Sequence, residues 1–254
     1  MSTEKPSKLN WLLSFQPRNI VLLSSWLKNQ GYSLELVRNY KKSGWLKPIG
    51  QGAFVRSGET IDVFGAIYAL QTQKGVDVHI GGRNAFSLLG RAHYLELERV
   101  STTFFASKDM DIPKWLKQYD WGIKINYHFT NFLDPWIGLV DFEIHGFSVK
   151  ISNVVRALLE CLYLTPHHQN LMECYELMES LNNCQPKEVQ KLLENCRSIK
   201  VKRLFLFLAE KIQHAWFEHL NLSSIDLGKG KRSILKNGIF DKKYQITVPK
   251  EWIE

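Results

Sequence analysis

Four side chains within five residues could contact DNA in two different ways. Arg38 and Asn39 can each form paired hydrogen bonds, arginine with a guanine edge and asparagine with an adenine edge. Lys41 and Lys42 suit phosphate groups, which fix the register of a protein on DNA without reading sequence. The alternative is a helical hairpin with ordinary solvated charge, and the four residue types alone leave both interpretations open.

These side chains need a helix whose other face is packed. Ser33 is suited to cap such a helix, because its hydroxyl can accept from backbone N–H groups of the first turn, and Gly44 is suited to end it. The cations should lie mainly on the outer side of this helix. We expect its inner side to carry four apolar residues: Leu34, Leu36, Val37 and Tyr40. Apolar spacing also predicts a preceding helix that ends at Gly31.

A hairpin should follow the second helix. Residues 45–49 and 53–56 are candidate strands, and Gly50-Gln51-Gly52 between them tolerates positive φ angles. Another apolar segment, residues 8–15, predicts a first helix. Helix, turn, helix and hairpin in this order predict a winged helix-turn-helix, in which the second helix enters the major groove.

The distribution of charge agrees with a nucleic-acid-binding N-terminal domain. The 254 residues carry a net charge of +8, and 44% are hydrophobic, enough for packed cores. Residues 1–50 hold eight Lys or Arg against two Asp or Glu, and residues 201–254 hold ten against six. Basic surface can also serve solubility alone, so charge by itself does not decide.

The rest of the chain predicts a mixed body. Helices are expected at 60–74, after the glycine pair 81–82, and at 112–119, with strands at 76–80, 102–106, 123–130, 139–145 and 147–151. His145-Gly146 is a candidate turn. Four helices should follow, at 153–164, 171–181, 186–196 and 199–219, before strands within 234–248. The predicted fold class is α+β: a winged domain over 1–58, then a larger mixed domain over 59–254, with the boundary within 58–96.

One acidic pair invites comparison with nucleases. Asp141 and Glu143 lie two apart on a predicted strand, with Lys150 nearby in the sequence, and carboxylates with a lysine could hold a metal against a phosphodiester. Alternation places both carboxylates on one face, which also fits a solvated strand, and we favour that interpretation. No catalytic residue, metal site or cofactor is therefore predicted.

Cysteine spacing and hydropathy indicate the state of the thiols and the cellular location of the protein. Cys161, Cys174, Cys184 and Cys196 lie 13, 10 and 12 residues apart without a C-x-x-C pair, which favours free thiols packed in helices over a metal site. The polar N-terminus has no apolar signal segment, and the longest apolar run, residues 204–209, is too short to span a bilayer. We expect a soluble cytoplasmic protein.

Two basic features near the C-terminus could bind an anionic partner. Lys202 and Arg203 lie near the start of the last predicted helix. Lys229, Lys231 and Arg232 alternate with glycines in a flexible segment that could wrap an anion. A solvated turn explains the second feature equally well.

A series of phrases along the chain is informative as a set. The N-terminal half contains SGWL, GQGAF, GAIYALQ and HIGGRNAFSLLGRAHYL. The C-terminal half contains RALLECLYLTP, ELMESL, SIKVKRLFLFLAEKIQHAWF and YQITVPK. None of these phrases is catalytic, but by their number and order the sequence resembles AbiEi-type antitoxins from about Leu9 to Lys250.

The resemblance implies a transcriptional autorepressor and antitoxin that binds inverted repeats in operator DNA, as a dimer in one possible arrangement. It would counteract a nucleotidyltransferase-like toxin in phage defence (abortive infection), without needing a stable complex. By position, the DNA-facing residues would be Ser33, Arg38, Asn39, Lys41 and Lys42, with Gln51 and Arg56 at or near the wing. Antitoxicity has no short motif, so its candidates are the C-terminal cations: Lys202, Arg203, Lys229, Lys231 and Arg232. The alternatives are a nuclease with a winged targeting domain and a plain dimeric repressor.

Overall fold

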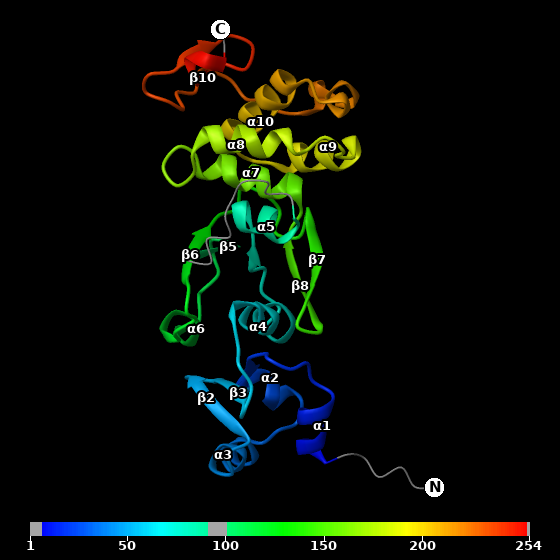
Figure 1. Cartoon of the computed structure of the whole chain (residues 1–254), viewed down its shortest axis with the longest axis vertical. Helices are drawn as coiled ribbons and strands as arrows, with labels where there is room; N and C mark the ends of the chain where they lie inside the picture. The colour runs from blue at the N-terminus through cyan, green and yellow to red at the C-terminus, as the bar shows by residue number, and fades with distance from the viewer. Residues whose placement is uncertain (1–6, 91–100, 253–254) are drawn as a thin grey trace, which may run out of the picture. The chain divides into compact units, whose positions relative to one another are not determined.

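The computed structural model describes residues 7–90 and 101–252, shown in Figure 1. They form two compact units, each built from several segments. The first comprises the described residues up to His79, with Asp109–Lys124 and Asp141–Lys150. The second comprises Ile80–Lys108, Ile125–Val140 and the described residues from Ile151 onward.

The first unit begins with three helices and three short strands. Their order is α1 (Lys8–Ser14), β1 (Leu22–Leu23), α2 (Ser24–Asn29), α3 (Leu34–Lys42), β2 (Leu46–Gly50) and β3 (Ala53–Arg56) (Figure 1). The strands form an antiparallel sheet in the order β1-β3-β2. The predicted helices and hairpin are present, together with a strand, β1, that the sequence did not predict.

Local sequence accounts for the helix boundaries here. The Ser33 hydroxyl accepts from the backbone N–H of Leu36 at 3.1 Å, as expected for the cap of α3. Leu12 and Leu27 are fully buried, and Val37 is 6% exposed. The Trp11 ring of α1 stacks on Trp26 of α2 and lies against Tyr32, which meets Tyr40 of α3, so the three helices pack together. Tyr32 lies between α2 and α3, where burial, with Tyr40 as a second cause, raises its pKa to about 12.

Two further helical segments and α6 (Lys114–Gln118) complete the helices of the first unit. The segment predicted as one helix over 60–74 is α4 (Val63–Tyr68) followed by a π-helical turn, η1 (Ala69–Gln73). It begins late because Asp62 caps α4, accepting from Phe64 N–H at 2.9 Å.

A five-stranded sheet has the order β6-β5-β4-β8-β7. Its strands are β4 (His79–Ile80), β5 (Ser101–Ala106), β6 (Lys124–Phe129), β7 (Leu139–Ile144) and β8 (Phe147–Ser152). β4 runs parallel to β8, with Ile80 opposite Ile151. The predicted turn at His145-Gly146 joins β7 to β8, with positive φ at both residues.

Helices dominate the second unit. α5 (Gly82–Leu88) packs against α7 (Val154–Leu164), and α10 (Ile199–Ile212) packs against α7 and α8 (Leu171–Glu179) (Figure 1). α9 (Pro186–Asn195) also contacts α7. The chain ends through η2 (Ala215–His219), η3 (Leu222–Ser224), β9 (Ile239–Asp241), β10 (Ile246–Val248) and η4 (Lys250–Trp252). Phe86, Leu158 and Phe205 are fully buried in its core.

The fold is mixed α/β, as predicted. The last long helix ends earlier than the sequence indicated, at Ile212, because Gln213 adopts a left-handed conformation with φ 61°. Among the described residues, no helix has the length and apolar character needed to cross a membrane.

Candidate functional site

The structure places four predicted DNA-contacting side chains on exposed positions of α3. Arg38, Asn39, Lys41 and Lys42 are all exposed, whereas Val37 on the same helix is buried. The Lys41 ammonium also lies 5.8 Å from the centre of the Phe54 ring on β3, a cation–π contact. α3 therefore presents three cations and an amide to solvent from a helix that is anchored on one face.

The turn between β2 and β3 supplies one more exposed polar residue. Gln51 is exposed at its tip. Gly50 lies beneath α6, since a methyl group added there would stand 2.6 Å from the Trp115 Cβ atom. The hairpin is thus supported on one side by packing, while Gln51 stays accessible.

The prediction that Arg56 lies exposed near the wing, facing DNA, is wrong. Its side chain is 3% exposed, and its guanidinium donates to the backbone carbonyls of Leu12 at 2.9 Å, Leu13, Gln16 and Pro17. Glu59 forms an ion pair with it at 3.0 Å. Arg56 therefore ties the end of β3 to the carboxyl end of α1, where helix carbonyls lack partners of their own.

The inward position expected for Leu34 is also wrong, because its side chain is 63% exposed. It is the first residue of α3, and Val37, one turn later, is the residue of this helix that is buried. Leu36 and Tyr40 are half-buried.

Near the C-terminus, two of the five predicted surface cations are buried. Lys202 and Arg203 are each 3% exposed on α10. The Arg203 guanidinium donates to the carbonyls of Leu227 at 2.8 Å, Gly230 at 2.7 Å and Gly228 at 3.0 Å. The expected surface position of Lys202 and Arg203 is wrong, because the part of α10 that contains them, residues 201–209, is buried on all sides.

The glycine-spaced segment does expose its cations. Lys229, Lys231 and Arg232 are exposed. The Lys231 ammonium lies 4.9 Å from the centre of the Phe240 ring. Arg203 donates to the carbonyls of Gly228 and Gly230 and so anchors the backbone of this loop. The three cations are exposed on that anchored backbone.

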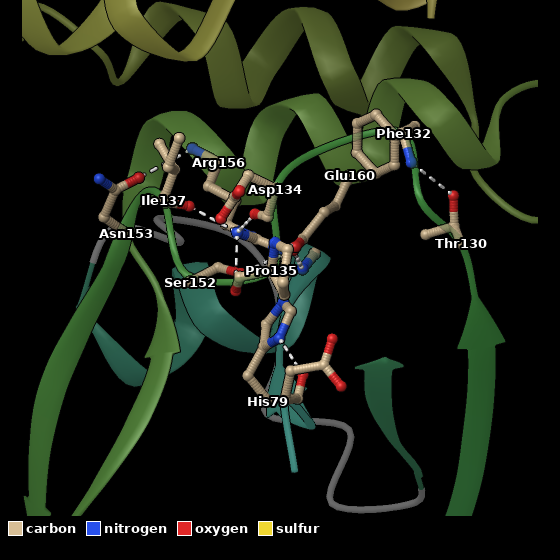
Figure 2. Close-up of polar contacts among 12 residues, drawn as sticks. His79, Thr130, Phe132, Asp134, Pro135, Ile137, Ser152, Asn153, Arg156 and Glu160 are labelled. Carbon is tan, nitrogen blue, oxygen red and sulfur yellow. Dashed lines mark hydrogen bonds and ion pairs between the residues drawn. The ribbon is translucent and has the colours of Figure 1, made fainter. Parts of the chain in front are cut away.

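A buried ion pair organises the start of the second unit (Figure 2). Arg156 and Glu160, one turn apart on α7, meet at 2.9 Å with side chains 5% and 0% exposed. Glu160 also accepts from the Ser152 hydroxyl at 2.8 Å and from the Gly82 N–H at 2.9 Å. A methyl group at Gly81 would stand 2.1 Å from this carboxylate, which explains the glycine there.

The other end of the pair holds a loop. Arg156 donates to the carbonyls of Asp134 at 2.8 Å, Pro135 and Ile137 (Figure 2). Trp136, at the centre of this loop, is 54% exposed. Arg156 and Glu160 therefore hold backbone groups of this loop and of Gly82 in place.

Two glutamines of η1 play a similar part in the first unit. The Gln73 amide donates to the Val21 carbonyl at 2.7 Å and accepts from the Leu23 N–H at 2.8 Å, completing the edge of β1. The Gln71 amide donates to the carbonyls of Val78 and Lys150 and accepts from the Lys150 N–H. Sequence patterns gave no sign of these long-range contacts.

The carboxylates considered for a nuclease lie on β7. Asp141 pairs with Lys150 of β8 at 2.7 Å, and this hydrogen bond holds the pKa of Asp141 below its usual value. Both side chains are exposed, as is Glu143. Within residues 7–90 and 101–252, no three His, Cys, Asp or Glu side chains are grouped to hold a metal.

Burial governs the thiols in the helices. Burial raises the pKa of Cys196 to about 11, and it also raises the pKa of Cys161 and Cys174 well above the usual value. These three side chains therefore carry protons at neutral pH and act as small apolar groups.

Family models match both parts of the chain. Residues 5–97 match the N-terminal domain of the AbiEi antitoxin transcriptional regulators, and residues 99–249 match the AbiEi antitoxin transcriptional regulator of type IV toxin–antitoxin systems. The chain belongs to the AbiEi antitoxin family. It is accordingly a transcriptional regulator and antitoxin of a type IV system, with an N-terminal domain followed by a larger C-terminal one.

A solved structure shares the AbiEi chain's fold. The RV2827C protein from Mycobacterium tuberculosis superposes with a TM-score of 0.59 at 12% identity, over 93% of this chain and 88% of that one. At this identity the likeness concerns the fold alone. No curated protein matches the chain significantly in sequence.

The phrases that identify this AbiEi chain have structural roles. GAIYALQ contains Gly65, where a methyl group would stand 2.2 Å from the Asn19 carbonyl oxygen, and Gln71 with its backbone contacts. HIGG contains Gly82, whose N–H donates to Glu160, and RALLE contains Glu160 and its partner Arg156 (Figure 2). The residues of RAHYL, 91–95, lie outside the described part of the chain.

One open hollow in the second unit has a polar lining. It encloses about 470 Å³ between residues of α5, α8 and the loop at Pro166, including Arg83, His167, His168 and Glu173. Arg83 pairs with Glu173 at 3.3 Å, and Gln169 donates to the same carboxylate. Its charged groups thus satisfy one another, and we assign it no ligand.

Proposed function

We propose that this AbiEi protein represses its own operon by binding DNA through α3 and opposes a nucleotidyltransferase-like toxin through its C-terminal domain. The observation that carries the DNA-binding half is the exposed row of polar residues on α3. The order helix, strand, helix, helix, strand, strand supports a winged helix-turn-helix, whose third helix would lie in the major groove.

In this proposal each part of the domain has one role on DNA. Arg38 and Asn39 contact base edges and give sequence preference. Lys41 and Lys42 contact phosphates, and Gln51 approaches the backbone or minor groove as the tip of the wing. Arg56 is not among the contacts, because it is buried against the end of α1. Two copies on an inverted repeat would double the contact area.

The antitoxic half rests on the second unit. We propose the loop cations Lys229, Lys231 and Arg232 as its contact surface, because they are exposed on a backbone that Arg203 holds. Antitoxicity without a stable toxin complex fits a basic loop that competes for an anionic group. We propose a boundary for the winged domain near Gly58 and no catalytic activity.

Separating the two activities tests the proposal. Arg38→Ala/Asn39→Ala should abolish repression of a reporter under the protein's own promoter, yet still rescue growth when the toxin is expressed from an unrelated promoter. Lys229→Ala/Lys231→Ala/Arg232→Ala should impair rescue and leave repression intact. The unrelated promoter is essential, because lost repression would otherwise raise toxin levels and imitate lost antitoxicity.

Either result could fail. If the α3 variant represses as well as the parent, α3 is not the DNA-reading helix. If it loses rescue under the unrelated promoter, neutralisation depends on DNA binding, and the assignment of two separate surfaces is wrong. Circular dichroism of both variants checks that they fold.

A further inference from the structure

Leu34 is a large apolar side chain on a surface made of charged and amide groups. It is 63% exposed at the first position of α3. Single exposed leucines are common on protein surfaces, so exposure alone carries no conclusion. Its neighbours on the helix make it informative.

Helical spacing aligns Leu34 with the cations. Residues three and four apart share a face, so Leu34, Arg38 and Lys41 form one row along α3. The Ser33 cap holds the backbone of the first turn, to which Leu34 belongs. Recognition helices contact base edges mainly through their N-terminal residues, and Leu34 occupies that end.

The charge of the neighbouring residue disfavours contact between this end of α3 and the DNA backbone. Glu35 is exposed beside Leu34, and a carboxylate would be repelled by phosphates. Base edges in the major groove tolerate both side chains, since cytosine presents an amino donor and thymine presents a methyl group. The first turn of α3 thus suits the floor of the groove, whereas its last turn, with Lys41 and Lys42, suits the phosphates.

We infer that Leu34 determines sequence preference by packing against the C5-methyl group of a thymine, next to the base that Arg38 reads. This inference rests on the proposed DNA binding by α3 and adds a base to the operator half-site. Among the bases of unmodified DNA, only thymine carries an apolar group in the major groove, and leucine is the apolar residue of this row.

The test removes only the methyl group. Full-length protein selects its preferred site from a random-sequence duplex library, and each thymine of that site is then replaced by deoxyuridine. We expect one position per half-site at which the replacement weakens binding about three- to fivefold, the value of one buried methyl group. Leu34→Ala should bind the thymine and deoxyuridine duplexes equally, whereas Arg38→Ala should keep the difference.

A matched control comes from the second unit. Leu222, also an exposed leucine, lies on η3, and Leu222→Ala should retain the full sensitivity to deoxyuridine. A wild-type protein that selects a site but tolerates deoxyuridine at every position would overturn the inference and leave DNA binding intact. If Leu34→Ala weakens binding to both duplexes by the same factor, so that the preference for thymine over deoxyuridine remains, Leu34 contacts another copy of the protein or the backbone, and the inference is wrong. Failure to select any sequence would instead overturn the proposed function.

Discussion

α3 and α10 both carry clusters of cations, but the two helices use them differently. On α3, Arg38, Lys41 and Lys42 are exposed, and Val37 is the residue that is buried. On α10, residues 201–209 are all buried, so no side of this part of the helix faces water. A run of positive charge in the sequence therefore marks a surface only when the helix has an open face.

Two cations of α10, the buried Arg203 and the half-buried Lys200, bind backbone carbonyls rather than acids, whereas Arg156 on α7 pairs with Glu160. Arg203 binds loop carbonyls, and Lys200 donates to the carbonyls of Tyr163 at 2.8 Å and Thr165 at 2.6 Å. Burial lowers the pKa of Lys200, with Cys174 as an opposing influence. These side chains exchange water for carbonyl oxygens and thereby fix loops, which is a structural use of charge.

The largest effect should come from breaking the buried pair on α7. Arg156→Met leaves the Glu160 carboxylate buried with its cation removed, and it frees the loop carbonyls around Trp136. We expect a loss of about 3–5 kcal/mol in the free energy of unfolding. Urea unfolding followed by tryptophan fluorescence measures it. The double variant Arg156→Met/Glu160→Gln should recover part of the loss, and no recovery would show that the carbonyl contacts dominate.

A smaller loss is expected on α10. Arg203→Met leaves the carbonyls of Leu227, Gly228 and Gly230 without their donor and should cost about 2–4 kcal/mol. The exposed loop variant Lys229→Ala/Lys231→Ala/Arg232→Ala is its control, and we expect it to change stability by less than about 0.5 kcal/mol. Equal losses of stability in both variants would contradict the assignment of a structural role to the buried Arg203 and not to the exposed loop cations.

The features that were predictable from sequence depend on neighbours in the chain. The Ser33 cap, the hairpin turn and the exposed cations of α3 each follow from a few adjacent residues. Arg56 was misplaced because its partners lie 39 to 44 residues earlier, at the end of α1. Glu160 meets the Gly82 N–H across 78 residues, so neither position indicates the other. Leu34 was misplaced because periodicity marks an apolar stripe without showing where its edge lies.

The exposed cations of α3 should separate into two classes on DNA. Arg38→Ala should cost about 1–3 kcal/mol on the selected site and little on random duplex, since it loses base contacts. Lys42→Ala should weaken both duplexes alike and reduce the salt dependence of binding by about one unit of slope. Fluorescence anisotropy across a salt series measures both. A salt slope that changes only with Arg38 would reverse the two assignments.

The smallest expected effect concerns His128, a half-buried histidine on β6. Its burial should make the stability of the protein depend on pH under mildly acidic conditions. Burial lowers the pKa of His128 from its usual 6.5, with His168 as a second cause and Glu160 opposing them. Its ring lies tilted against the Phe105 ring, with centroids 5.4 Å apart. The unfolded chain therefore takes up this proton at higher pH than the folded chain does.

The free energy of unfolding should consequently decrease as the pH is lowered through a defined window. The contribution of His128 is complete above pH 6.5 and is lost as the pH falls from there through the lower folded-state pKa. His128→Gln should flatten the dependence of unfolding free energy on pH between about 7.5 and 5.5, and His168→Gln should flatten it partly. Urea titrations across this range measure the slopes. Parallel curves for the wild type and His128→Gln would show that this imidazole gains its proton equally in both states.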